Sequence, residues 1–171
     1  MDEELPAELD TEATLLCAAL WLRDTTRARL IAEHVHAADF TRPAHATIYT
    51  AWQRQVRAGQ PHDAATVLAR LTAAGTDEVP RTVHTALRGI ITLGAEPTAA
   101  ASHALDVVTA AYRRSYTALA ATIAHAAEAA ATDELFPILV EHGRRQRTQA
   151  YRLHTLRRTL GADPNDEGAA A

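Results

Sequence analysis

The sequence has 171 residues, the length of one ordinary domain, and we expect no room for a nucleotide-hydrolysing motor beside it. Its formal net charge of −4 gives no global argument for nucleic-acid binding, and a single cysteine, Cys17, excludes a disulfide framework. Alanine is frequent, aromatic residues make up only 5% of the chain, and β-branched runs are absent. This composition predicts an all-α fold, because alanine favours helix and strands prefer β-branched and aromatic residues.

The two ends of the chain read as poorly structured segments. Residues 1–11, which we call the acidic leader, contain Pro6 and are expected to be flexible, as is the tail over residues 161–171. The leader lacks the positive flank and apolar stretch of a signal peptide, and no run approaches ~18 strongly apolar residues. We therefore expect a cytoplasmic protein with no membrane partner.

Residues 12–95, which we call the head, show the sequence signals of five short helices. Thr11 is expected to cap the first helix, which ends near Arg23. Asp24 is expected to cap a second helix that runs to about Val35.

The other three helices of the head begin next to proline or aspartate. After a turn over residues 36–42, Pro43 suits the first position of a third helix, which Gly59 ends. Asp63 is expected to cap a fourth helix, and a fifth follows Pro80. The expected inward positions of these helices are Ile48, Trp52, Val56, Val67, Leu68, Leu71, Val83, Leu87, Ile90 and Ile91.

A long helical hairpin is predicted for residues 96–160, because residues 98–131 contain neither glycine nor proline. Asp133 opens the second arm, which we expect to continue to Leu160 despite Gly143. Apolar residues recur three and four apart along both arms, a spacing that suits packing against other helices. Either the arms bury these side chains against each other alone, or they also bind a second copy, and we expect a homodimer or a higher homo-oligomer. The predicted self-association residues are Leu105, Val108, Tyr112, Leu119, Leu135, Leu139, Leu153 and Leu156.

No catalytic, cofactor or metal site is predicted. The sequence has no G-x-x-x-x-G-K-[ST] phosphate loop and no G-x-S-x-G nucleophile elbow. It has nine histidines, but no two of them have the i, i+4 spacing of a zinc-protease helix. Glu33-x-x-His36 occurs once, where a di-iron bundle needs such a motif twice. We therefore expect a protein that is not an enzyme and has no cofactor.

Arginines gather in the second arm of the hairpin. Their forked hydrogen bonds suit phosphates or the carboxylates of an acidic protein partner, and a solvated helix face is the third interpretation. Only Tyr151 offers a nearby aromatic ring, which counts against binding of single-stranded nucleic acid. The candidate contact residues are Arg144, Arg145, Arg147 and Arg152.

Residues 39–51 contain the pattern D-F-x-x-x-x-H-x-x-I-x-x-A, and residues 59–66 continue it with G-x-P-x-D and a threonine. These residues resemble the signature of the N-terminal domain of DnaB-type replicative helicases. Residues 12–22 are similar to the first helix of that family, and residues 96–100 to the start of its hairpin. We expect a structural role for the motif residues Phe40, Pro43, His45, Ile48, Gly59, Pro61, Asp63 and Thr66.

The resemblance implies a head and a hairpin through which two copies pair, and it implies a replicative helicase, a primase or a helicase loader as partner. We therefore expect a stand-alone, non-catalytic interaction and oligomerisation module of DNA replication. Two alternatives remain open. One is a regulator that binds nucleic acid through the arginines, and the other is a domain of the kind with which primase binds the helicase, which looks like the same fold.

Overall fold

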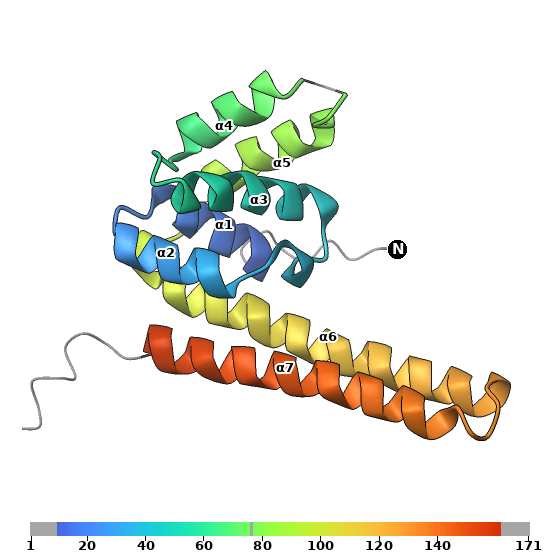
Figure 1. Cartoon of the computed structure of the whole chain (residues 1–171). Coiled ribbons are helices and arrows are strands. Elements are labelled where there is room, and N and C mark those ends of the chain that lie inside the picture. Colours follow the sequence, from blue (N-terminus) through green and yellow to red (C-terminus); the bar gives the residue numbers. More distant parts are fainter. Residues whose placement is uncertain (1–9, 76, 162–171) are drawn as a thin grey trace, which may run out of the picture. The chain divides into compact units, whose positions relative to one another are not determined.

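The computed structural model describes residues 10–75 and 77–161. The predicted leader and tail lie outside these residues, except for Asp10, Thr11 and Gly161. The described residues form five short helices followed by two long ones, which confirms the all-α prediction (Figure 1). These helices are α1 (Thr11–Trp21), α2 (Thr25–His34), α3 (Pro43–Arg57), α4 (Ala64–Ala73), α5 (Arg81–Ile91), α6 (Ala100–Ala129) and α7 (Leu135–Gly161), with short 3-10 helices η2 (Ala37–Asp39) and η3 (Pro97–Ala99).

The chain divides into two compact units, residues 1–107 and residues 108–171. The first unit contains α1 to α5 and the first two turns of α6. The second unit contains the rest of α6, which runs beside α7 as a helical hairpin (Figure 1). The division therefore lies inside a continuous helix.

Aspartate caps and glycine ends set the helix boundaries of the first unit as predicted. Asp24 caps α2 by accepting a hydrogen bond from the backbone N–H of Arg27 at 3.0 Å. Asp63 caps α4 by accepting one from the N–H of Thr66 at 3.0 Å. Gly59 follows α3 with a φ of 65°, a conformation that side chains other than glycine adopt only with strain.

The start of α1 differs from the prediction by one residue. Asp10, and not Thr11, caps this helix, because its carboxylate accepts a hydrogen bond from the N–H of Ala13 at 3.2 Å. The same carboxylate pairs with the guanidinium of Arg42 at 2.7 Å. Asp10 therefore joins the beginning of α1 to the residue that precedes α3.

The two long helices follow the predicted hairpin with one shifted boundary. The second arm passes through Gly143 without a break, as expected. It begins at Leu135 and not at Asp133, because the N–H of Glu134 bonds to the carbonyl of Ala131 at 2.9 Å in the connecting turn. Asp133 and Glu134, which were predicted to begin the helix, therefore belong to the connecting turn.

α3 is the central helix of the first unit and packs against α1, α2, α4 and α5. Ile48, Tyr49 and Trp52 on this helix have no exposed surface. The Tyr49 hydroxyl donates to the carbonyl of Val35 at 3.0 Å, and the Trp52 indole N–H donates to the carbonyl of Ala19 at 3.0 Å. α3 thus donates to carbonyls at the ends of α1 and α2, where the regular hydrogen bonds of a helix stop.

α4 and α5 bury narrower faces than α3. Val67 and Leu71 of α4 are buried as predicted. Leu68 and Ile91, which were also expected to face inward, are only partly buried. α4 has its main contacts with α3 and α5, so one side of it remains open to solvent.

A buried carboxylate connects α1 to the beginning of α3. Glu12 Oε1 accepts hydrogen bonds from the N–H and the hydroxyl of Thr41 at 2.7 and 2.6 Å, and Oε2 lies 3.0 Å from His45 Nδ1. Burial raises the pKa of Glu12, but the hydrogen bonds from His45 and Thr41 outweigh it and lower the pKa to about 2. The carboxylate is therefore ionised, and His45 Nδ1 acts as a donor to it.

We expect Gly59→Ala to lower the free energy of unfolding by about 1 kcal/mol, because alanine is strained at a positive φ. Gly89→Ala is the matched control, since Gly89 lies inside α5 and an added Cβ meets no atom within 4 Å at either glycine. In a helix, alanine should raise the free energy of unfolding by about 0.5–1 kcal/mol. Urea denaturation followed by circular dichroism measures both changes, and a loss at both positions would contradict the assigned conformations.

Glu12→Gln should lower the free energy of unfolding at pH 7 by about 1–3 kcal/mol, because hydrogen bonds to a charged acceptor become hydrogen bonds to a neutral one. The pKa of Glu12 falls from 4.5 to about 2 on folding, so the stabilisation is complete above pH 4.5 and is lost as the pH falls toward 2. The difference between the two proteins should therefore shrink over this range. Urea denaturation at a series of pH values measures it, and a constant difference would refute the assignment.

Candidate interaction surfaces

Three motif residues lie in the core of the first unit. Phe40, His45 and Ile48 are 7%, 3% and 0% exposed. Phe40 stacks on Tyr49 with ring centroids 4.9 Å apart, and His45 bonds to Glu12. The sequence analysis expected a structural role for His45 but missed its partner, which is 33 residues away along the chain.

The other motif residues form helix ends. Pro43 occupies the first position of α3, and Gly59 and Pro61 lie in the connection to α4. The Thr66 backbone and hydroxyl both bond to Asp63, and these hydrogen bonds hold the pKa of that carboxyl below its usual value. These motif residues therefore contribute contacts and helix boundaries to the fold of the head.

The predicted self-association residues divide by exposure. Val108, Leu153 and Leu156 are 0%, 5% and 0% exposed in the single chain. Leu153 and Leu156, which were expected to contact a second copy, are thus already buried within the single chain. Leu139 is 49% exposed. The remaining members, which are partly buried, are Leu105, Tyr112, Leu119 and Leu135.

Polar pairs lie along the middle of the hairpin. The Ser115 hydroxyl donates to the Gln146 side-chain oxygen at 2.9 Å, and the Gln146 amide donates to the Ser115 carbonyl at 3.1 Å. The hydroxyls of Tyr112 and Tyr116 lie 3.0 Å apart, and this hydrogen bond raises the pKa of Tyr112. The first pair joins α6 to α7, whereas the second lies along α6 alone.

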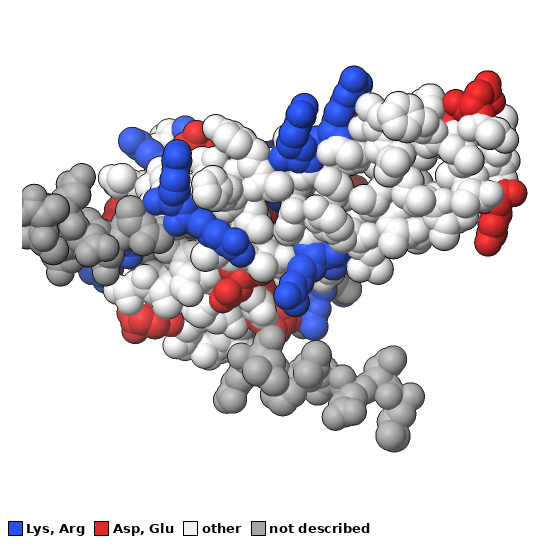
Figure 2. Space-filling model, turned by 90° about the horizontal axis from the view of Figure 1, so that it is seen from below, with Lys and Arg blue, Asp and Glu red and all other residues white. Residues whose placement is uncertain are grey.

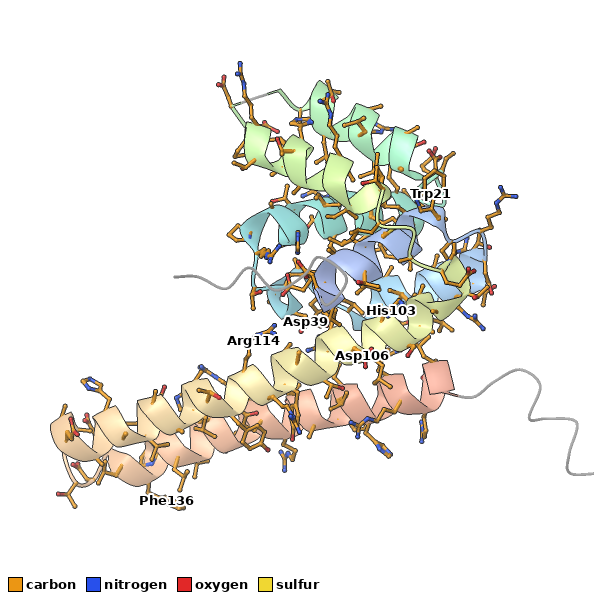
Figure 3. All side chains as sticks on the ribbon, turned by 180° about the vertical axis from the view of Figure 1, so that it is seen from behind. Trp21, Asp39, His103, Asp106, Arg114 and Phe136 are labelled. Atoms are coloured by element: carbon orange, nitrogen blue, oxygen red, sulfur yellow. The ribbon has the colours of Figure 1, made fainter. Side chains whose placement is uncertain are left out.

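An apolar cavity of about 350 Å³ opens where α6 ends and α7 begins. Two of its side chains are strongly exposed, Phe136 at 71% and Leu139 at 49%. Figure 3 shows Phe136 pointing away from the hairpin close to its connecting turn. Phe136 was not among the predicted self-association residues, although it is a large aromatic residue next to Leu135, which was. We call the residues that line this cavity the tip cluster: Ile123, Ala126, Ala127, Leu135, Phe136 and Leu139.

The candidate arginines of α7 differ in exposure and in their partners. Arg144 and Arg147 are exposed, whereas Arg145 pairs with Glu141 at 3.0 Å. Arg152 is partly buried and donates a hydrogen bond at 2.8 Å to the glutamine three residues before it. Figure 2 shows basic side chains in small separate groups on the visible face, with uncharged and acidic surface between the groups. A continuous basic band, which would follow a phosphate backbone, is not seen on that face.

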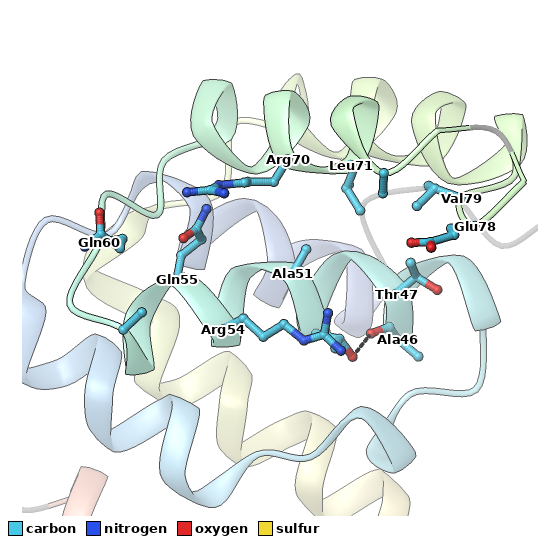
Figure 4. A pocket seen from close by; sticks show the side chains of 13 residues that line it. Ala46, Thr47, Ala51, Arg54, Gln55, Gln60, Arg70, Leu71, Glu78 and Val79 are labelled. Carbon is cyan, nitrogen blue, oxygen red and sulfur yellow. Dashed lines mark hydrogen bonds between the residues drawn. The ribbon is translucent and has the colours of Figure 1, made fainter.

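A second and larger cavity, of about 690 Å³, lies in the first unit beside α3 and α4. Figure 4 shows Arg70, Gln55 and Gln60 toward one end of it and Glu78 toward the other. This cavity could not be predicted from local sequence signals, because its charged residues come from segments that only the fold brings together. We call it the α3–α4 groove, and it is lined by Ala46, Thr47, Thr50, Ala51, Arg54, Gln55, Ala58, Gln60, Arg70, Leu71, Ala74, Glu78 and Val79.

The described residues, 10–75 and 77–161, contain no candidate metal site and no candidate membrane span. Within these ranges, histidine, cysteine, aspartate and glutamate side chains do not gather in any group of three or more that could hold a metal ion. Over the same residues, no helix is both long enough and apolar enough to cross a membrane.

Comparison with known proteins identifies the family. Residues 4–92 match the DnaB-like helicase N terminal domain. Among solved structures, the N-terminal domain of DnaB helicase from Mycobacterium tuberculosis is similar, with a TM-score of 0.60 and 24% sequence identity over 82% of this chain and 94% of that chain. The search of curated proteins found no match. Because the family model covers more than half of the chain, this chain belongs to the family of DnaB-like helicase N-terminal domains.

Proposed function

We propose that this chain is a non-catalytic interaction and oligomerisation module of DNA replication. In this proposal two copies pair through the hairpin, and the assembled domains engage a replicative helicase, a primase or a helicase loader. The family match supports the replication role, because the matched residues are those of the helicase's N-terminal domain. The exposed tip cluster is the observation that carries the pairing.

The proposed pairing surface includes fewer residues than the self-association set expected from the sequence. Val108, Leu153 and Leu156 are buried within one chain and are not available to a partner without rearrangement. Phe136 and Leu139 are available, and each is a large apolar side chain at the edge of an apolar cavity. Full burial of such a side chain contributes about 1.5–3 kcal/mol, so a second copy that covers both would be stabilised by them.

The double variant Phe136→Glu/Leu139→Glu should convert a dimer into a folded monomer, because association would bury carboxylates without partners. We expect the dissociation constant to rise about 100-fold or more, since the lost burial exceeds 2.7 kcal/mol. Sedimentation velocity measures the change, and circular dichroism checks that the helices remain.

Tyr151→Glu provides the matched control for that experiment. Tyr151 lies on the same helix and is 72% exposed, but it does not belong to the tip cluster. This variant should remain dimeric. A wild-type chain that sediments as a monomer would refute the pairing, and an unchanged dimer in the double variant would refute the tip cluster as its surface.

Partner binding has a separate test. The purified chain should co-sediment with the host's primase or helicase loader, as expected for the helicase side of the interaction. Co-sedimentation with the helicase alone would instead favour the alternative of a primase-type helicase-binding domain. No complex with any of the three proteins would contradict the replication-partner proposal.

A nucleic-acid-binding regulator remains the second candidate, because Arg144 and Arg147 are exposed on α7. Under this alternative, DNA affinity should fall steeply with salt and should be lost in Arg144→Ala/Arg145→Ala/Arg147→Ala. Arg81→Ala/Arg88→Ala on α5 removes exposed arginines elsewhere and serves as the control. Fluorescence anisotropy with labelled DNA measures both, and an absence of binding at low salt would remove this candidate.

A further inference from the structure

We infer that the α3–α4 groove binds residues 1–9 of the acidic leader of the same chain. The proposal concerns a surface in the first unit and does not depend on self-association or on a replication partner. Three observations carry it. They are the charges of the groove, the apolar floor between them and the position at which the leader joins α1.

The groove is lined by two arginines, Arg54 and Arg70. Among the described residues, neither Arg54 nor Arg70 takes part in an ion pair. Figure 4 shows the Arg70 side chain directed toward Gln55, which is only 6% exposed. Residues 1–9 contain four acidic residues and no basic one, and the acids concentrate at positions 2–4. Arginine binds carboxylates through paired, charge-assisted hydrogen bonds, so the charges of the two segments are complementary.

The floor of the groove suits the apolar residues of the leader. Leu71 and Val79 are 4% and 5% exposed and line the groove together with several alanines. The leader contains two leucines, Leu5 and Leu9, which follow its acidic residues at positions 4 and 8. An extended segment could therefore bury these leucines while its carboxylates reach the arginines.

The leader also starts close enough to reach the arginines. Asp10 is held against Arg42 at 2.7 Å, and the groove begins at Ala46, one helical turn further along α3. From Ala46 to Arg54 the helix rises about 12 Å. Nine extended residues span up to about 30 Å, so the acids at positions 2–4 can reach Arg54 and Arg70.

Glu78 gives the groove a direction. Its carboxylate lies near Thr47 and Val79, at the opposite end from Arg70 (Figure 4). Thr47 belongs to the first turns of α3, on the side where Asp10 holds the leader. The leader would therefore pass Glu78 before it reaches Arg70. Neutralising Glu78 should strengthen the docking, whereas neutralising the arginines should abolish it.

The test compares the amide resonances of the full chain with those of a variant whose leader is neutral, Asp2→Asn/Glu3→Gln/Glu4→Gln/Glu8→Gln. The length of the chain is unchanged, so effects of a new terminus do not enter. We expect the amides of Ala51, Leu71 and Ala74 to shift between the two proteins at low salt, and to shift less as salt screens the charges.

The same comparison is then made in an Arg54→Gln/Arg70→Gln background, where we expect the shifts to disappear. Arg81→Gln/Arg88→Gln is the control background and should preserve them, whereas Glu78→Gln should enlarge them. Shifts confined to the surroundings of Asp10, or shifts that persist without Arg54 and Arg70, would overturn the proposal. Addition of a synthetic peptide of residues 1–9 to the neutral-leader variant should reproduce the groove shifts. A peptide that leaves the groove amides unmoved at high concentration would also overturn it.

Discussion

The head is organised around two side chains of α3 that donate hydrogen bonds to backbone carbonyls of the adjacent helices. Tyr49 and Trp52 are fully buried, and each donates a hydrogen bond to a backbone carbonyl near the end of an adjacent helix. Carbonyls at the end of a helix lack the regular partner four residues further on, and a buried carbonyl with no partner at all costs about 1–3 kcal/mol. Among the described residues, Trp52 and Tyr49 are the two largest fully buried side chains, so they bring both volume and polar connections to a core rich in alanine. The position of α3 determines those of α1 and α2.

The buried carboxylate of Glu12 adds a constraint of another kind. It fixes the segment between α2 and α3 by accepting hydrogen bonds from Thr41 and His45. Hydrophobic packing alone is not directional, and an ionised group with several donors defines one geometry. The family motif thus combines an aromatic plug, a histidine and helix caps, all of which serve the fold. This distribution explains why the motif identifies the family without pointing to its binding surfaces.

The sequence predicted the fold well because its signals are local. Aspartate caps, proline at the start of α3 and glycine after it act within one turn of the chain, and the predicted boundaries agree with the structure to within one or two residues. The Glu12–His45 pair was missed because nothing local marks a contact between residues 33 apart. The exposure of individual side chains was harder to predict, because periodicity shows which face of a helix is apolar but not which other residues cover that face. Leu153 and Leu156 share their spacing with Leu139, and only the folded chain shows that the first two are covered and the third is not.

The exchange of hydrogen bonds between Ser115 and Gln146 has a consequence for how the hairpin assembles. Two helices with apolar residues every three or four positions can pack in several alignments that differ by one turn, about 5.4 Å. A slip of one turn would carry the Gln146 amide away from Ser115, so both of its hydrogen bonds to α6 would be lost. A slipped hairpin would then carry stranded polar groups at a cost of about 1–3 kcal/mol each. Gln146 thus disfavours misaligned hairpins, because only the correct alignment gives its side chain both hydrogen bonds to Ser115.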